Sequence, residues 1–287
     1  MAFDDIVRNP HFRDVSNRPV QRGNSYPKQR PPHEPMSPQG RARRVRCTQY
    51  FWLDMPVAFT GTLGEQKQAA TLPKNFPLLI RGAWSDLTDP RVQLTNNSTG
   101  VPLSTLQVPL LTLAGNTDLV HPLLFWRRPF LLKANTSLRG SFLNDGDEDA
   151  GDVVFFCERP DLDFEVPVIE TASYELLLEL GLDGVASSTG NTQTQQVEYD
   201  LLIYGALSTS IGITAQFTDT RLNQAWSSDE LPIGAFAGVV GNPQPIVYYS
   251  TPYFLPRNTS IKVKFTNNAD DPETGKFISF ICERILQ

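Results

Sequence analysis

The eight residues LLIRGAWS at positions 78–85 return, little changed, as LLIYGALS at positions 201–208. A second pair follows, PFLLKANTSL at 129–138 and PYFLPRNTSI at 252–261. Both pairs are 123 residues apart, and recurrence at a fixed distance is the sequence signature of a repeated structural unit. The sequence therefore predicts a tandem duplication, in which one fold is encoded twice.

The same register extends across most of the chain. It holds without a net insertion between residues 51–144 and 174–267. The two copies end on FFCER (155–159) and FICER (280–284), with two extra residues in the preceding loop of the second copy. We expect four parts: an arm over residues 1–46, a first domain over 47–160, a linker over 161–173 and a second domain over 174–287.

Each copy has the pattern of a β-sheet protein. SIKVKF at 260–265 alternates polar and apolar residues, as a half-buried strand does. Short apolar segments at 174–180 and 277–281 are separated by clusters of Asn, Gly and Pro that favour turns. About seven or eight such strands per copy indicate a sandwich or barrel, with one short helical turn within 103–115. We predict an all-β fold of two tandem, internally duplicated β-sandwich domains.

Asn-Thr-Ser occurs at 135–137 and again at 258–260, just before an alternating strand. Asn, Thr and Ser side chains bond to nearby backbone groups, so the tripeptide predicts a turn. It also matches the acceptor sequence for N-glycosylation. No basic and apolar signal peptide is visible at the N-terminus, and no apolar run reaches the ~18 residues of a membrane helix. We therefore expect a structural turn, in a protein made in a reducing, aqueous compartment.

Residues 1–46 differ in composition from the remainder. They hold ten Arg or Lys against four acids and so carry a formal charge of +6, whereas the other 15 basic and 27 acidic residues give −12. With seven prolines and few apolar side chains, this arm is expected to be extended by itself. The arginines expected to contact other subunits are Arg8, Arg13, Arg18, Arg22, Arg30, Arg41, Arg43, Arg44 and Arg46.

Three roles are open for this arm. Its arginines could form paired hydrogen bonds with carboxylates on the acidic body of a neighbouring subunit. They could instead neutralise the phosphates of a nucleic acid. The arm could also be a solvated leader without a partner. Because the body is too acidic to extend a phosphate-binding surface, we expect the assembly role.

The sequence carries no recognisable catalytic motif. Cys47, Cys157 and Cys282 are far apart, without metal-ligand spacing, and are expected to be buried. Two of the three histidines lie in the arm, so a catalytic site would depend on His121 alone. A pair of glycosidase carboxylates drawn from distant strands remains formally open. We expect no enzymatic activity and no cofactor.

The acidic loop at 144–152 contains the one metal candidate. Asp145, Asp147 and Asp149 have the spacing that opens a calcium-binding loop, but Ala150 and Phe156 replace the glycine and glutamate that such a loop needs. A solvated hairpin tip, or a landing site for a neighbour's arm, is the alternative. We therefore predict no metal, with these aspartates as the weak calcium candidate.

Four tryptophans suggest a second class of function, a tandem carbohydrate-binding module of a host-recognition device. Sugars stack on exposed aromatic rings, which assigns the platforms to Trp52, Trp84, Trp126 and Trp226. Trp84 aligns with a leucine and Trp126 with a tyrosine in the second copy, and these replacements suit a core better. Buried packing is the interpretation that we favour.

The recurrent elements form the pattern L-L-I-x-G-A, then A-G, then P-x-x-L-x-x-N-T-S-(L/I), and finally C-E-R, over residues 51–287. This pattern behind a basic arm resembles the structural proteins of bacteriophage particles that carry jelly-roll-type domains. The resemblance implies a virion protein made in the host cytoplasm, with copies of itself and other virion proteins as partners. A capsid, decoration, collar, head–tail or tail component would fit, and no membrane association is implied.

Overall fold

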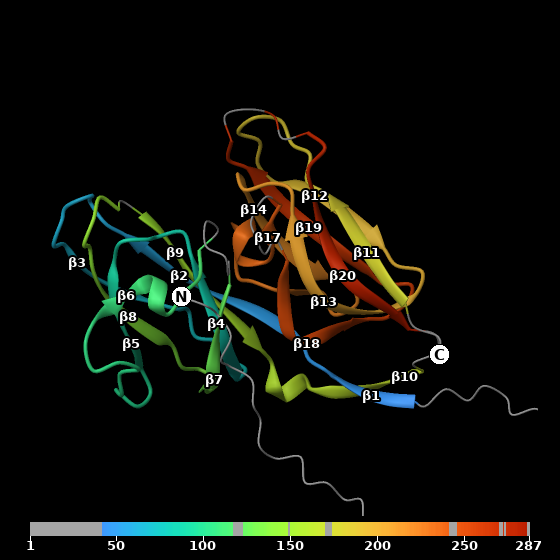
Figure 1. Ribbon diagram of the computed structural model, residues 1–287, viewed down its shortest axis with the longest axis horizontal. Coiled ribbons are helices and arrows are strands. Elements are labelled where there is room, and N and C mark those ends of the chain that lie inside the picture. The colour runs from blue at the N-terminus through green and yellow to red at the C-terminus, as the bar shows by residue number, and fades with distance from the viewer. Residues whose placement is uncertain are drawn as a thin grey trace, which may run out of the picture. The chain divides into compact units, whose positions relative to one another are not determined.

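The architecture is all-β, as the sequence predicts. In the part of the chain that the structure describes, each regular element is a β-strand or a single turn of 3-10 helix. The two copies seen in the sequence each form a pair of sheets (Figure 1). The computed structural model describes residues 42–116, 123–148, 150–169, 174–240, 246–269, 272 and 274–285.

The first half has eight strands and one turn of 3-10 helix. They are β2 (Tyr50–Ala58), β3 (Gln66–Ala70), β4 (Leu78–Ser85), β5 (Arg91–Asn96), β6 (Val108–Pro109), η1 (Leu110–Thr112), β7 (Leu124–Leu132), β8 (Leu138–Leu143) and β9 (Ala150–Glu158). One sheet has the antiparallel order β2-β9-β4-β7 and the other β3-β8-β5-β6. The short helical turn lies within the segment where the sequence predicts one. Given these two strand orders, every connection except that from β5 to β6 crosses from one sheet to the other.

The second half repeats this order. Its elements are β11 (Tyr174–Gly181), β12 (Asn191–Gln196), β13 (Asp200–Ser208), β14 (Ile213–Asp219), β15 (Gln224–Ala225), β16 (Leu231–Pro232), η4 (Ile233–Ala235), β17 (Gly238–Val239), β18 (Val247–Leu255), β19 (Ser260–Asn267) and β20 (Phe277–Ile285). One sheet has the order β11-β20-β13, with β18 and β17 on β13. The other has the order β12-β19-β14, with β15 and β16 on β14. Each strand of the first half thus has a counterpart.

A bulge explains the glycine of the repeated LLIxGA motif. In β4 and in β13 the register shifts between the isoleucine and the glycine. A Cβ on Gly82 would lie 2.3 Å from the Leu124 carbonyl oxygen, and one on Gly205 would lie 2.3 Å from that of Val247. The neighbouring strand comes so close at the bulge that no side chain fits. The motif therefore encodes a local kink in the sheet.

The Asn-Thr-Ser tripeptides form the turns that the sequence predicts. Asn135 and Asn258 have left-handed backbones, with φ of 58° and 61°. The threonine after each donates its hydroxyl to the carbonyl oxygen three residues back, that of Lys133 (2.6 Å) or Pro256 (2.5 Å). Asparagine tolerates this conformation better than most residues. The repeated tripeptide is accounted for by local backbone geometry.

Each half has a core between its two sheets. In the first half, β2 and β9 contribute Leu53 and Phe155, which pack with Phe142 of β8. In the second half, the alternation predicted at residues 260–265 places Ile261, Val263 and Phe265 in the core. That core also includes residues of the first half, among them Tyr50 and Trp52. Residues 40–287 form one compact unit, within which each repeat has its own pair of sheets.

Two strands occur where we expected the end of the arm and the linker. Residues 42–47, most of which we assigned to the extended arm, form β1 (Ala42–Cys47). Within the expected linker, η2 (Pro160–Leu162) is followed by β10 (Phe164–Ile169), which pairs antiparallel with β1. Each strand supplies the other's backbone partners from over 100 residues away. Because each strand depends on a partner far away in the sequence, the local composition does not predict either of them.

Candidate assembly surfaces

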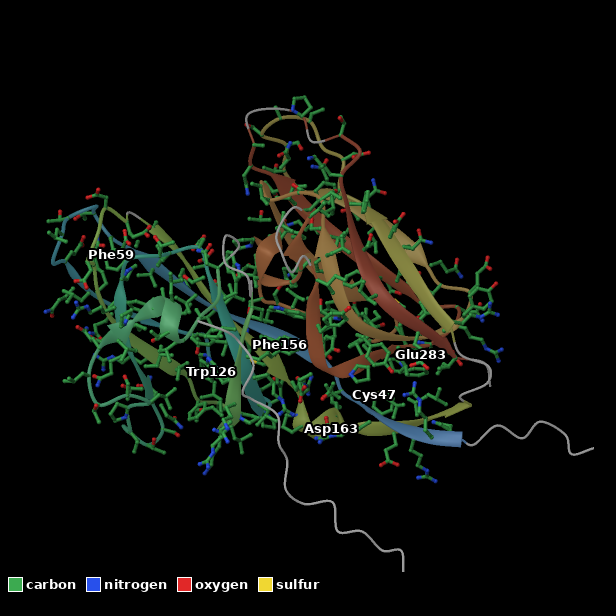
Figure 2. All side chains as sticks on the ribbon, in the orientation of Figure 1. Cys47, Phe59, Trp126, Phe156, Asp163 and Glu283 are labelled. Atoms are coloured by element: carbon green, nitrogen blue, oxygen red, sulfur yellow. The ribbon has the colours of Figure 1, made fainter. Side chains whose placement is uncertain are left out.

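The β1–β10 ribbon covers a hydrophobic patch on the second half. Its strands alternate, so that Cys47, Val166 and Val168 face inward and are buried. They pack with Leu202 and Ile285 of the second half in one cluster, with Val45, Tyr204 and Phe254 at its margin. Figure 2 marks Cys47 and Glu283 in this region. The end of the basic segment is therefore held by apolar contact as well as by charge.

Arg43 of the ribbon pairs with a carboxylate of the second half. Its guanidinium lies 2.6 and 2.7 Å from the two carboxylate oxygens of Glu283, whose side chain is 13% exposed. The Tyr204 hydroxyl donates to the same carboxylate at 2.7 Å. Burial, and then the hydrogen bond to Glu283, raise the pKa of Tyr204. Glu283 thus accepts hydrogen bonds from Arg43 of β1 and from Tyr204 of β13. These bonds tie the ribbon to the second half.

The other two arginines of β1 are more exposed. Arg44 pairs with Glu165 at 3.2 Å, and Arg46 pairs with Asp163, its Nε lying 3.0 Å from the carboxylate. Exposed pairs of this kind contribute little to stability. Thus the three predicted arm arginines that the structure describes contact carboxylates of their own chain. The remaining six, Arg8, Arg13, Arg18, Arg22, Arg30 and Arg41, lie outside the described residues.

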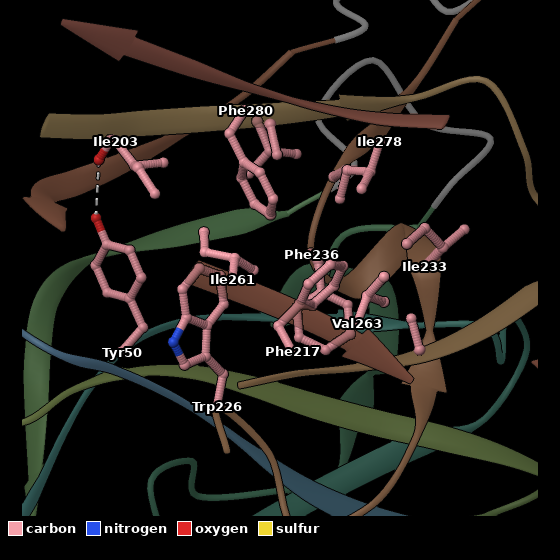
Figure 3. Packing of buried hydrophobic residues seen from close by; sticks show 14 of the residues in the cluster. Tyr50, Ile203, Phe217, Trp226, Ile233, Phe236, Ile261, Val263, Ile278 and Phe280 are labelled. Atoms are coloured by element: carbon pink, nitrogen blue, oxygen red, sulfur yellow. Dashed lines mark hydrogen bonds between the residues drawn. The ribbon is translucent and has the colours of Figure 1, made fainter. Parts of the chain in front are cut away.

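A joint of aromatic side chains connects the two halves. The Trp52 amide donates to the Trp226 carbonyl oxygen at 2.6 Å, and its indole Nε1 donates to Ala235 at 2.9 Å. The two indole rings stack with centroids 5.6 Å apart. The Tyr50 hydroxyl donates to the Thr251 carbonyl oxygen. The Ile203 carbonyl oxygen also lies within hydrogen-bond range of it, as the dashed line in Figure 3 shows. One face of strand β2 therefore packs in the core of the first half, and the other face packs against the second half.

A buried carboxylate crosses the same joint. Glu158 accepts from Nε and a terminal nitrogen of Arg81, at 2.8 and 2.6 Å. Its other oxygen accepts from the Ser250 hydroxyl of the second half at 2.6 Å. The Glu158 side chain is 2% exposed, so that removing one partner would leave an uncompensated charge. Both oxygens of Glu158 are therefore paired, one within the first half and one across the joint.

Three further carboxylates gather where the halves meet, and sequence reasoning missed them. Burial, and then the negative charge of Asp152, raise the pKa of Asp54 to about 7. Burial also raises the pKa of Asp86 to about 6 and that of Asp152. Asp86 and Asp152 line a cavity of about 420 Å³, together with Thr214 and other residues of the second half. Their raised pKa values predict that the joint weakens as the pH rises.

The acidic loop is held by residues of the neighbouring segment 88–91. Asp145 pairs with Arg91 at 2.5 Å, and Glu148 accepts from the amide and hydroxyl of Thr88. Asp147 is exposed, and Asp149 lies outside the described residues. No group of three or more His, Cys, Asp or Glu residues in the described part is arranged to hold a metal ion. The described aspartates of the calcium candidate do not converge.

The cysteines and tryptophans fill the interior. Cys47, Cys157 and Cys282 are free and buried, which confirms the expectation. Trp52, Trp84 and Trp226 are at most 2% exposed, so none presents a face on which a sugar could stack. Trp126 is half-buried and donates to the Leu113 carbonyl oxygen (2.7 Å), as its counterpart Tyr249 does to Phe236 (2.8 Å). These aromatics belong to the cores and the joint, and His121 lies outside the described residues.

Neither a scan against models of protein families nor a search of curated proteins found a match to this chain. Within the described ranges, no helix is long and apolar enough to span a bilayer. Function must therefore be argued from the repeat, the ribbon and the joint.

Proposed function

We propose that this chain is a non-enzymatic structural protein of a bacteriophage-type virus particle. Each half would be a jelly roll, and the two would descend from one duplicated domain. The supporting observation is the strand order, in which the eight strands of the first half form two sheets and their counterparts in the second half do the same. The bulge and the left-handed asparagine also recur at equivalent positions of both halves. Two Greek keys in a double sheet are what the jelly-roll architecture requires.

A particle protein needs contact surfaces more than a reaction centre. We assign no reaction and no cofactor to the chain, and we assign the virion as its location after synthesis in the host cytoplasm. Its partners would be further copies and other virion proteins. Beyond β1, the basic segment of residues 1–41 would extend to acidic surfaces of neighbouring subunits, where it would exchange conformational freedom for wide contact area. A nucleic acid remains the alternative partner for that segment.

Deletion of residues 1–39 tests this role, since it keeps β1 and the whole compact unit. The truncated and full-length chains, treated with nuclease, would be compared by sedimentation velocity and electron microscopy. We expect an unchanged melting temperature and a loss of large assemblies. Raising the salt from about 0.1 M to 1 M should weaken assembly of the full-length chain, because screening shortens charge attraction. Identical sedimentation of both chains would reject the lacing role.

A further inference from the structure

The loop between β5 and β6 and its counterpart between β14 and β16 are held in the same way. In the first half, the Gln93 side chain donates to the Ser104 carbonyl oxygen at 2.8 Å. In the second half, Gln216 donates to Ser227 at 2.9 Å, and both pairs are related by the 123-residue offset. The two loops are thus equivalent elements of the repeat, with equivalent paths along the sheet edge.

In the second half, this loop is the element that receives the first half. The carbonyl oxygen of Trp226 accepts from the Trp52 amide, and Ser227 forms a parallel bridge with Trp52. The Trp226 side chain is 2% exposed, because it packs between Phe217 of its own half and the aromatic rings of the joint. The loop therefore offers one backbone acceptor and one apolar side chain to strand β2.

In the first half, the equivalent loop has no such neighbour among the residues that the structure describes. Leu103 stands where the second half has Trp226, and it is 39% exposed. Val101 and Leu106 beside it are 59% and 74% exposed. The surrounding residues 97–109 contain no charged side chain, in a chain of which 20% is charged. Apolar side chains gathered on a loop without charges are typical of a contact surface.

We propose that the Val101–Leu106 loop is the docking site for the second half of another copy of this chain. The occupant would be β11, which corresponds to β2. Trp52 pairs with Phe156 and Leu177 pairs with Ile281, so that the position of Leu177 takes the place of Trp52. Around it, Leu207 and Ile281 occupy the positions of Trp84 and Phe156, and both are half-buried. The contact inside one chain would then be repeated between chains. This inference rests on the proposed self-assembly.

The geometry of that contact has a consequence for symmetry. A loop of one subunit binding a different surface of the next is a heterologous contact, which forms rings if the rotation closes and filaments if it does not. An isologous dimer would instead join like surfaces. The two cases differ in which pairs of engineered cysteines can meet, and this makes the proposal testable without knowing the particle.

Cross-linking between single-cysteine additions is the direct test. Chains carrying Leu103→Cys are mixed with chains carrying Leu177→Cys under mild oxidation. We expect a covalent dimer from the mixture and none from either variant alone. The matched control replaces Leu103→Cys with Leu63→Cys, which is 70% exposed, and should give no dimer. The native cysteines are buried and so should not react. A dimer in the control mixture, or none in the test mixture, would overturn the docking site.

A charge-insertion pair separates this inference from the proposed function. The double variant Val101→Lys, Leu106→Lys should melt like the wild type but lose the large assemblies in sedimentation. The matched double variant Leu63→Lys, Val185→Lys, with both side chains 70% exposed, should retain them. If both variants assemble as the wild type does, the docking site is wrong while self-assembly stands. If the wild type itself stays monomeric, the proposed function fails and this inference with it.

Discussion

At Gly82 and Gly205 the backbone of the neighbouring strand leaves no room for a side chain. Gly82→Ala should therefore force the bulge of β4 to open, at a cost of about 1–3 kcal/mol in the free energy of unfolding. Urea denaturation measures this cost. The matched change is Gly181→Ala in β11, where a Cβ meets nothing within 4 Å, and we expect about 0.5 kcal/mol or less there. Equal losses at both sites would show that the close approach has no energetic weight.

Asp54 gives the joint its pH dependence. Its folded pKa of about 7 lies above the ordinary value of 3.8, so the folded protein binds this proton more tightly than the unfolded chain. The stabilising contribution is complete below the ordinary value and is lost as the pH rises through about 7. Asp54→Asn should therefore raise the melting temperature at pH 8 and have little effect at pH 4. We expect about 1–2 kcal/mol, since partial exposure screens the charge.

The control for this titration is Asp147→Asn, a change of the same chemistry at an exposed position of the acidic loop. Melting curves of both variants and the wild type, recorded from pH 4 to 8, separate the effect of the joint from that of net charge. A melting temperature of Asp54→Asn that follows the wild type at every pH would contradict the assignment.

At the scale of elements, the Arg43–Glu283 pair should decide whether the β1–β10 ribbon stays in place. Arg43→Ala removes both hydrogen bonds to a carboxylate that is 13% exposed. We expect a loss of about 1–2 kcal/mol and faster hydrogen exchange in the amides of β1 and β10. Arg44→Ala, at a side chain 78% exposed, should leave the exchange unchanged. Equal protection in both variants would mean that the apolar contacts alone hold the ribbon.

How far the elements could be predicted depended on where their partners lie. Strand β19 was predictable because Ile261, Val263 and Phe265 alternate with polar residues within one short segment. Strand β1 has a single valine between arginines, and its partner β10 lies over 100 residues away, so local pattern could not find the pair. The carboxylates of the joint, Asp54, Asp86 and Asp152, lie on segments with no common spacing, and only the folded sheet brings them together.

At the scale of the whole molecule, the residues of β2 show how two halves become one unit. Phe51 and Leu53 face the core of the first half, while Tyr50 and Trp52 face that of the second. A strand buried on both faces has a continuous apolar sequence instead of an alternating one. The run YFWL at residues 50–53 is the sequence signal for the joint.

Trp52→Ala should uncouple the two halves. The substitution leaves a cavity between Trp226 and Phe156 and removes the indole hydrogen bond to Ala235, for a loss of about 3–5 kcal/mol. Because Phe51 and Leu53 still complete the core of the first half, calorimetry should resolve two unfolding transitions where the wild type has one. Leu53→Ala, from the same strand, damages one core and leaves the joint intact, so its single transition should move to lower temperature without splitting. A single, lowered transition in Trp52→Ala would mean that the remaining contacts, such as Glu158 with Ser250, couple the halves without the indole.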